Sequence, residues 1–117
     1  MPFYTLQDVP QELVTPKHST ALGRLITGSQ VEFGILSFKA GQGAEVHAHP
    51  QEQIVYVLKG RMKVFTEGSE TVIGPGQAAH FLPSVPHGTK MLDDVEAISV
   101  KGVIDGVGHK KIGRAHV

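Results

Sequence analysis

Apolar and polar residues alternate along most of the chain in short runs, which glycine, proline and acidic residues separate. Alternation with period 2 is the pattern of strands that bury one face. We expect such strands at residues 31–39, 44–49, 53–58, 61–66, 70–73, 78–82, 87–91 and 95–100. Turn-forming sequences lie between them, for example Glu67-Gly68-Ser69. The pattern therefore predicts an all-β barrel or sandwich.

The first 30 residues differ from this region. They hold two further candidate strands, at residues 2–6 and 19–26, and a short helical turn within residues 6–13. An arm of this kind can pair with the exposed edge of a neighbouring sheet, so we expect it to form a homodimer.

The predicted organisation is one structural domain with an arm at 1–30, a β-barrel at 31–101 and a tail at 102–117. A chain of 117 residues can bury one core, but it is too short for a second domain. We expect the C-terminal tail to be a solvated terminus. The alternative is that the tail lies across one mouth of the barrel.

Composition narrows the class of partner. The 11 basic and 11 acidic side chains cancel, which gives no electrostatic footprint for nucleic acid or an anionic membrane. The expected partner is therefore a small molecule. The first ten residues lack a basic leader and a long apolar run, and no stretch approaches a membrane span, so we expect a cytoplasmic protein. The absence of cysteine leaves nitrogen and oxygen ligands for any metal.

Histidines provide the most specific chemical evidence in the sequence. His47 and His49 are two positions apart on a predicted strand, and side chains at this spacing project from the same face. Their imidazoles can therefore meet at one ion, with further groups from the paired strand and from a later strand, where His87 lies. Three core histidines at these spacings are hard to explain otherwise. The sequence predicts a metal site divided among strands.

The residues around the first two histidines resemble the first motif of the cupin superfamily of double-stranded β-helix barrels. That motif has Gly, five residues, His-x-His, three or four residues, Glu, six residues and Gly. Gly41, His47, His49 and Gly60 fit this spacing, and Gln53 occupies the acidic position.

The second cupin motif is matched less completely. It has Gly, five residues, Pro-x-Gly, two residues, His, three residues and Asn. Gly76 and His87 keep the outer spacing, whereas Ser84 stands at the second glycine and Met91 at the asparagine. With the flanking strands, the resemblance covers residues 31–100 and implies a cupin, or jelly-roll, barrel.

The resemblance also implies a ligand set. Carried over by position, the metal ligands are His47, His49, Gln53 and His87. The implied cofactor is one divalent transition metal ion, Zn, Ni, Fe, Mn or Cu. Glu52 is the rival to Gln53 as fourth ligand. Strand parity favours Gln53, because it shares a face with the valines two and four positions further on.

A neutral amide in place of a carboxylate leaves the full +2 charge on the ion, which makes it a harder Lewis acid. The ligand set resembles that of small cupins related to the pectin-degradation protein and of cupin-type hydroxynitrile lyases, which use the metal as a Lewis acid. The uronate-processing members carry an Asp-x-Phe pair on the last barrel strand, where this chain has Ser99 and Lys101. The resemblance to these cupins therefore implies their metal site in this chain, but it does not imply their substrate.

We expect a metal-dependent lyase, isomerase or tautomerase that acts on an oxygenated small metabolite. Glu45 lies two positions before His47, so the same parity predicts a pocket carboxylate that could move a proton. The alternatives are a metal-dependent dioxygenase and a non-catalytic module that binds a metal or a small molecule.

Overall fold

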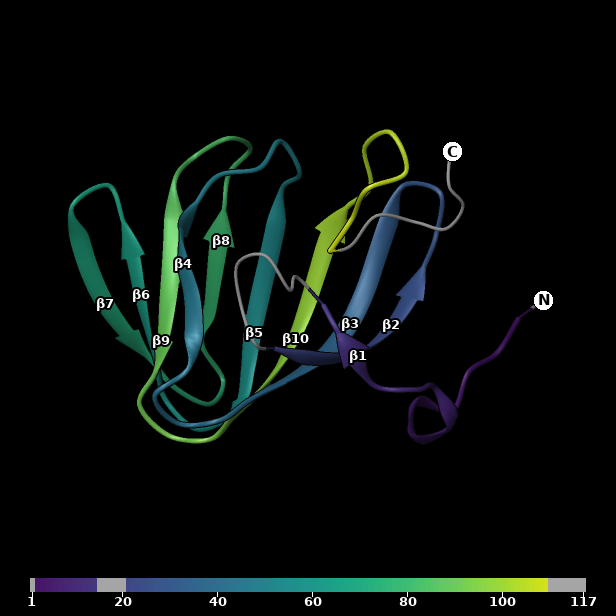
Figure 1. Ribbon diagram of the computed structural model, residues 1–117, viewed down its shortest axis with the longest axis horizontal. Coiled ribbons are helices and arrows are strands. Elements are labelled where there is room, and N and C mark those ends of the chain that lie inside the picture. The colour runs from purple at the N-terminus through teal and green to yellow at the C-terminus, as the bar shows by residue number, and fades with distance from the viewer. Residues whose placement is uncertain (1, 15–20, 110–117) are drawn as a thin grey trace.

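The computed structural model describes residues 2–14 and 21–109. Its strands form two antiparallel sheets that face each other (Figure 1). The larger sheet has the order β1-β2-β3-β10-β5-β8, and the smaller has the order β4-β9-β6-β7. The elements are η1 (Leu6–Asp8), β1 (Glu12–Leu13), β2 (Leu22–Thr27), β3 (Val31–Phe38), β4 (Gly43–His47), β5 (Gln53–Lys59), β6 (Met62–Thr66), β7 (Ser69–Ile73), β8 (Ala78–Phe81), β9 (His87–Met91) and β10 (Val95–Gly102).

The barrel strands predicted from the alternating pattern are confirmed as β3 to β10. In the arm, the helical turn is confirmed as the 3-10 helix η1, and β2 confirms the second candidate strand in its described part; residues 19–20 lie outside the described residues. The predicted strand at 2–6 is wrong, since residues 2–5 form no strand. Phe3 there is 86% exposed, so no packed face holds this segment in a sheet.

The core lies between the two sheets because the strands alternate in burial. On β5, Val55 and Val57 are buried, whereas Ile54 and Tyr56 are exposed on the outer face. Buried residues from both sheets form the main cluster, namely Val55, Val57, Met62, Val64, Ile73, Phe81, Met91, Val95 and Ala97. Burial of these side chains is the dominant favourable contribution to the fold.

The inner face of β10 changes character along its length. Val95 and Ala97 are apolar and buried in the core, and the next two inward positions are Ser99 and Lys101, also buried. The alternation therefore continues, but the residue type changes from apolar to polar. This change divides the interior into an apolar end and a polar end, and the candidate site lies in the polar end.

The C-terminal segment after β10 returns to the barrel instead of remaining in solvent. The Gln51 side chain donates a hydrogen bond to the carbonyl of Val107 at 2.8 Å, and His109 is only 4% exposed. The solvated tail expected from the sequence is thus wrong for the segment up to His109, because buried polar groups hold it. Residues 110–117 lie outside the described residues.

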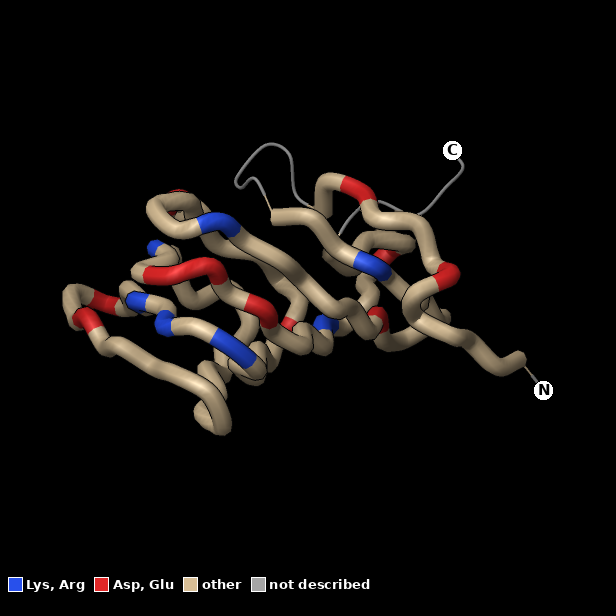
Figure 2. Tube along the Cα trace, turned by 90° about the horizontal axis from the view of Figure 1, so that it is seen from below, with Lys and Arg blue, Asp and Glu red and all other residues tan. Residues whose placement is uncertain are grey.

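Charged residues of both signs are interspersed over the molecule, as Figure 2 shows. In the described part of the chain, no helix has the length and apolar character needed to cross a membrane.

Candidate metal centre

Three imidazoles converge at the polar end of the barrel. His47 is the last residue of β4 and pairs in register with His87, the first residue of β9, while His49 lies in the loop that follows β4. One nitrogen from each ring lies within 4.8 Å of the others. The ring centroids of His87 lie 4.7 Å from those of both other histidines. The predicted convergence of these three side chains is therefore present in the structure.

The three rings share one hydrogen-bond pattern. Each Nδ1 lies at hydrogen-bond distance from the carbonyl oxygen of a residue two positions away in the chain, so each Nδ1 carries the proton that it donates. With Nδ1 protonated, Nε2 carries the lone pair that a metal requires. The pairs are His47 with Glu45 at 2.6 Å, His49 with Gln51 at 2.8 Å and His87 with Val85 at 2.9 Å.

The protonation state of the rings also suits a cation. Burial, followed by the positive charge of Lys101, lowers the pKa of His49 to about 4. Burial also lowers the pKa of His87. Both rings are then neutral at pH 7, as a metal ligand must be. His49 Nε2 is buried and has no hydrogen-bond partner among the described residues, and a coordinated ion would satisfy it.

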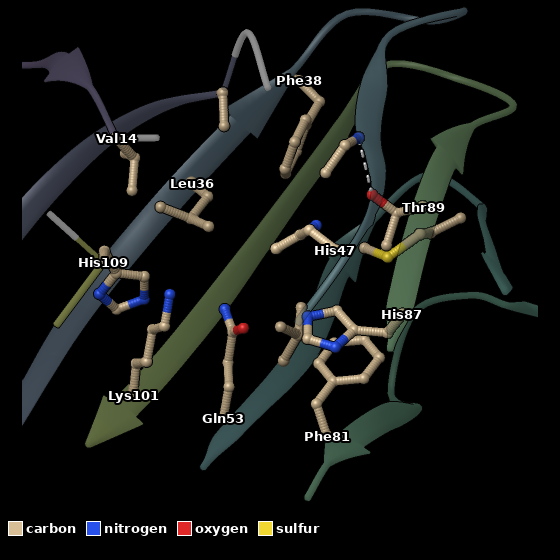
Figure 3. A pocket seen from close by; sticks show the side chains of 14 residues that line it. Val14, Leu36, Phe38, His47, Gln53, Phe81, His87, Thr89, Lys101 and His109 are labelled. Atoms are coloured by element: carbon tan, nitrogen blue, oxygen red, sulfur yellow. Dashed lines mark hydrogen bonds between the residues drawn. The ribbon is translucent and has the colours of Figure 1, made fainter. Parts of the chain in front are cut away.

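Gln53 begins β5 and lines the same cavity as His47 and His87. Its Nε2 donates to Ser99 Oγ at 2.9 Å, and Figure 3 shows its oxygen on the side of His87. Glu52, the rival ligand, is turned outward, where its carboxylate contacts His80 Nε2 at 2.5 Å. The structure thus places Gln53, and not Glu52, beside the histidines, as strand parity predicted.

A series of buried and part-buried hydrogen bonds connects Gln53 to Glu32. The Glu32 carboxylate accepts from the backbone N–H of His109 at 2.6 Å and from its Nδ1 at 2.7 Å, and it also accepts from the Thr27 hydroxyl. His109 Nε2 then accepts from Ser99 Oγ at 2.6 Å. A carboxylate can only accept hydrogen bonds, so every donor in this series points toward Glu32. Gln53 donates to Ser99, Ser99 donates to His109, and His109 donates to Glu32. This direction assigns the Gln53 Nε2 to Ser99 and leaves its Oε1 for the cavity.

The charge states within this series follow from its contacts. Burial opposes ionisation of Glu32, but the hydrogen bonds from His109 and Thr27 outweigh it and lower the carboxyl pKa. Burial lowers the pKa of His109 against the effect of Glu32. At neutral pH we therefore assign an ionised Glu32 and a neutral His109, the states that the direction of the series requires.

The site opens into a cavity of ≈ 60 Å³, several times the roughly 10–15 Å³ needed by one water molecule. Apolar side chains such as Leu36 and Phe38 form one wall. The polar lining residues are His47, Gln53, His87, Thr89, Lys101 and His109 (Figure 3). Burial lowers the pKa of Lys101 to about 8.

Glu45 does not lie in this cavity, and the parity that predicted it there is wrong. A β-bulge interrupts β4, since Ala44 pairs with Thr89 whereas His47 pairs with His87. The bulge inserts one extra residue on β4, so Ala44 and His47 line the cavity and Glu45 is exposed.

Glu32, His109 and the contacts of Ser99 and Lys101 were not anticipated from the sequence. The alternating pattern contains part of the information, because Glu32 shares a strand face with Leu36, and Lys101 shares one with Ala97. An ionisable residue on an otherwise inward face marks a candidate site residue. No local pattern indicates that His109 returns to this point.

The family of the chain is now clear. The Cupin_2 model, described as a cupin domain, matches residues 34–101, so the chain belongs to this family, as the two motifs predicted. No similar sequence was found among curated proteins.

Solved structures agree on the fold. An RmlC-like cupin from Shewanella frigidimarina is 20% identical with a TM-score of 0.77, and the match covers 87% of this chain and 90% of that one. KdgF from a Halomonas species is 22% identical with a TM-score of 0.76, over 87% and 93% of the two chains. A predicted oxalate decarboxylase from Thermotoga maritima is 14% identical with a TM-score of 0.75, over 88% and 100%.

Proposed function

We propose that this protein is a mononuclear metal-dependent cupin enzyme that acts on an oxygenated small metabolite as a lyase, isomerase or tautomerase. The observation that carries the proposal is the convergence of three Nδ1-protonated imidazoles on one point, within 4.8 Å of one another. A divalent transition metal held there would act as a Lewis acid that polarises a carbonyl or hydroxyl group.

His47, His49, His87 and the Oε1 of Gln53 would hold the ion. All four donors are neutral, so the protein offsets none of the charge of a divalent cation. Lewis-acid chemistry is favoured by this donor set. The apolar wall at Leu36 shields part of the cavity from water and strengthens electrostatic contacts within it.

The name of one structural neighbour is consistent with this proposal. This neighbour is a predicted oxalate decarboxylase, a name that refers to a small, oxygen-rich substrate. At 14% identity this likeness concerns the fold, so the donor set remains the principal support for the proposed chemistry.

The test is elemental analysis of the purified full-length protein beside a His47→Ala, His87→Ala double variant. We expect about one divalent metal ion per wild-type chain and its loss in the double variant. His80→Ala is the matched control, because His80 is exposed and lies outside the cavity. Unchanged metal content in the double variant would refute the metal centre.

Oxygen uptake and turnover then separate the classes of function. Conversion of a hydroxy-carbonyl substrate without oxygen uptake supports the lyase or isomerase. Substrate-dependent oxygen uptake would instead identify a dioxygenase. Tight ligand binding without turnover across a wide substrate panel would identify a non-catalytic binding module.

We also propose that the N-terminal arm pairs with a second copy of the chain to form a homodimer. Phe3 and Tyr4 are exposed in the described structure, at 86% and 56%, and a partner surface would bury them. Light scattering on the wild type and on a Phe3→Ser, Tyr4→Ser variant tests this, with a dimer expected only for the wild type.

A further inference from the structure

Lys101 is a buried residue at the polar end of the barrel, and its side chain ends in an ammonium group. Only 5% of the residue is exposed, and its side chain lines the cavity (Figure 3). Within residues 2–14 and 21–109, the structure gives this ammonium no hydrogen bond and no ion pair within 4.0 Å. An unpaired buried charge is costly, which points to a bound group that compensates it.

The nearest carboxylate does not fill this role. Glu32 is the register partner of Lys101 on β3, and its charge acts on the ammonium from a distance. Both of its oxygens are already acceptors, one for His109 and the other for Thr27. The Glu32 carboxylate therefore belongs to the series of hydrogen bonds that leads to Gln53, and it does not form an ion pair with Lys101.

The side chains that line the cavity carry a positive formal charge. Among its described lining residues, Lys101 is the one lysine or arginine, and none is acidic. The imidazoles and the Gln53 amide add no negative charge, so a bound divalent cation would make the cavity more positive still. An anion is the ligand that such a cavity favours.

Lys101 lines the same cavity as His47 and His87, so one small molecule in that cavity could contact all three side chains. Lys101 is the register partner of Gln53 on β5, and side chains of such partners have Cβ atoms roughly 4.5–5.5 Å apart. Figure 3 shows the Lys101 and Gln53 side chains rising beside each other into the cavity.

We propose that Lys101 binds the carboxylate of a small hydroxy- or oxo-carboxylate whose neighbouring oxygen lies toward His47, His49 and His87. The placement of that oxygen rests on the proposed function, whereas the ion pair with Lys101 does not. Lys101 thereby selects an anionic substrate from the wider class of oxygenated metabolites.

The experiment measures the binding of lactate and of its neutral analogue lactamide by titration calorimetry, with metal-free and Zn²⁺-loaded full-length protein. We expect metal-free wild type to bind lactate about tenfold or more tightly than lactamide, since a buried hydrogen bond to a charged group has this effect. Lys101→Met should lose this preference while its Zn²⁺ content stays unchanged. Lys90→Met, which removes an exposed lysine, should bind as wild type.

The outcomes of this experiment distinguish the proposed metal centre from the proposed anion site at Lys101. A wild-type protein that binds no Zn²⁺ but prefers lactate refutes the metal centre and supports Lys101 as the anion site. A protein that binds Zn²⁺ but shows no lactate preference in its metal-free form overturns the role of Lys101. The comparison within the wild type needs no variant, so it decides the matter even if Lys101→Met fails to fold.

Discussion

Ser99→Ala should damage both the stability of the barrel and the orientation of Gln53. The substitution removes the hydroxyl that donates to His109 Nε2 at 2.6 Å and accepts from Gln53 Nε2 at 2.9 Å. His109 is buried and loses its partner for Nε2, whereas Gln53 is half-buried and can turn its amide group toward the cavity. The protein therefore has one buried acceptor unsatisfied and one proposed metal ligand without its orienting contact.

The magnitude follows from these two losses. An unsatisfied buried polar group costs about 1–3 kcal/mol of unfolding free energy. For a chain of 117 residues, at roughly 2.1 cal/mol/K per residue, that cost lowers Tm by about 4–12 °C. Loss of the contact that orients a ligand lowers metal affinity by about 10–100-fold.

Thermal unfolding of the metal-free protein and competition with a chelator measure the two effects separately. Ser37→Ala is the matched control, because Ser37 lies on β3 of the same sheet, half-buried, and does not line the metal-site cavity. It should shift Tm and metal affinity far less. Ser99→Ala with the Tm and the metal affinity of the wild type would refute the orienting role of the series of hydrogen bonds between Glu32 and Gln53.

Three further predictions concern the turns, the cavity and the bulge. Gly60→Ala should lower the free energy of unfolding by more than Gly76→Ala does, as measured by denaturant titration. Both glycines have positive φ, but an added Cβ at Gly60 would lie 2.2 Å from the carbonyl oxygen of Asp94, whereas one at Gly76 would meet nothing within 4 Å. Equal losses of stability in the two variants would contradict this prediction. Lactate binding should weaken as pH rises through about 8, because the Lys101 ammonium then loses its proton. The free energy of unfolding of the metal-free protein should rise between pH 8 and 10.5, because in this range Lys101 stays protonated only in the unfolded chain. Lactate binding that does not change with pH would be evidence against an ion pair. Glu45→Gln should leave metal content and turnover unchanged, because Glu45 is exposed beyond the bulge, and a large loss of turnover would show that this carboxylate acts in the reaction.

The sequence by itself determined the strands and most of the side chains that converge at the candidate metal centre. Alternation with period 2 is a local property, so it identified β3 to β10 and placed Gln53 on the inner face with Val55 and Val57. The spacing of His47 and His49 is equally local. These features depend only on the geometry of an extended chain, which a few consecutive residues already define.

Other features depend on contacts that no local pattern encodes. The bulge in β4 arises where β4 meets β9, and it turns Glu45 outward although its spacing from His47 predicted the opposite. The bond between His109 and Glu32 joins residues 77 positions apart, and it brings the C-terminal segment against the site.

The state of the site was also decided by the tertiary structure. In the sequence Lys101 is one polar residue at the end of the last predicted strand, but in the fold it is buried and its side chain lines the cavity beside Gln53. The pKa of His49 falls to about 4 because neighbouring strands and loops exclude water from it. Burial of the site away from water and pairing between distant strands exist only once the two sheets have packed together. These two effects set the pKa values and the contacts of the side chains in the cavity.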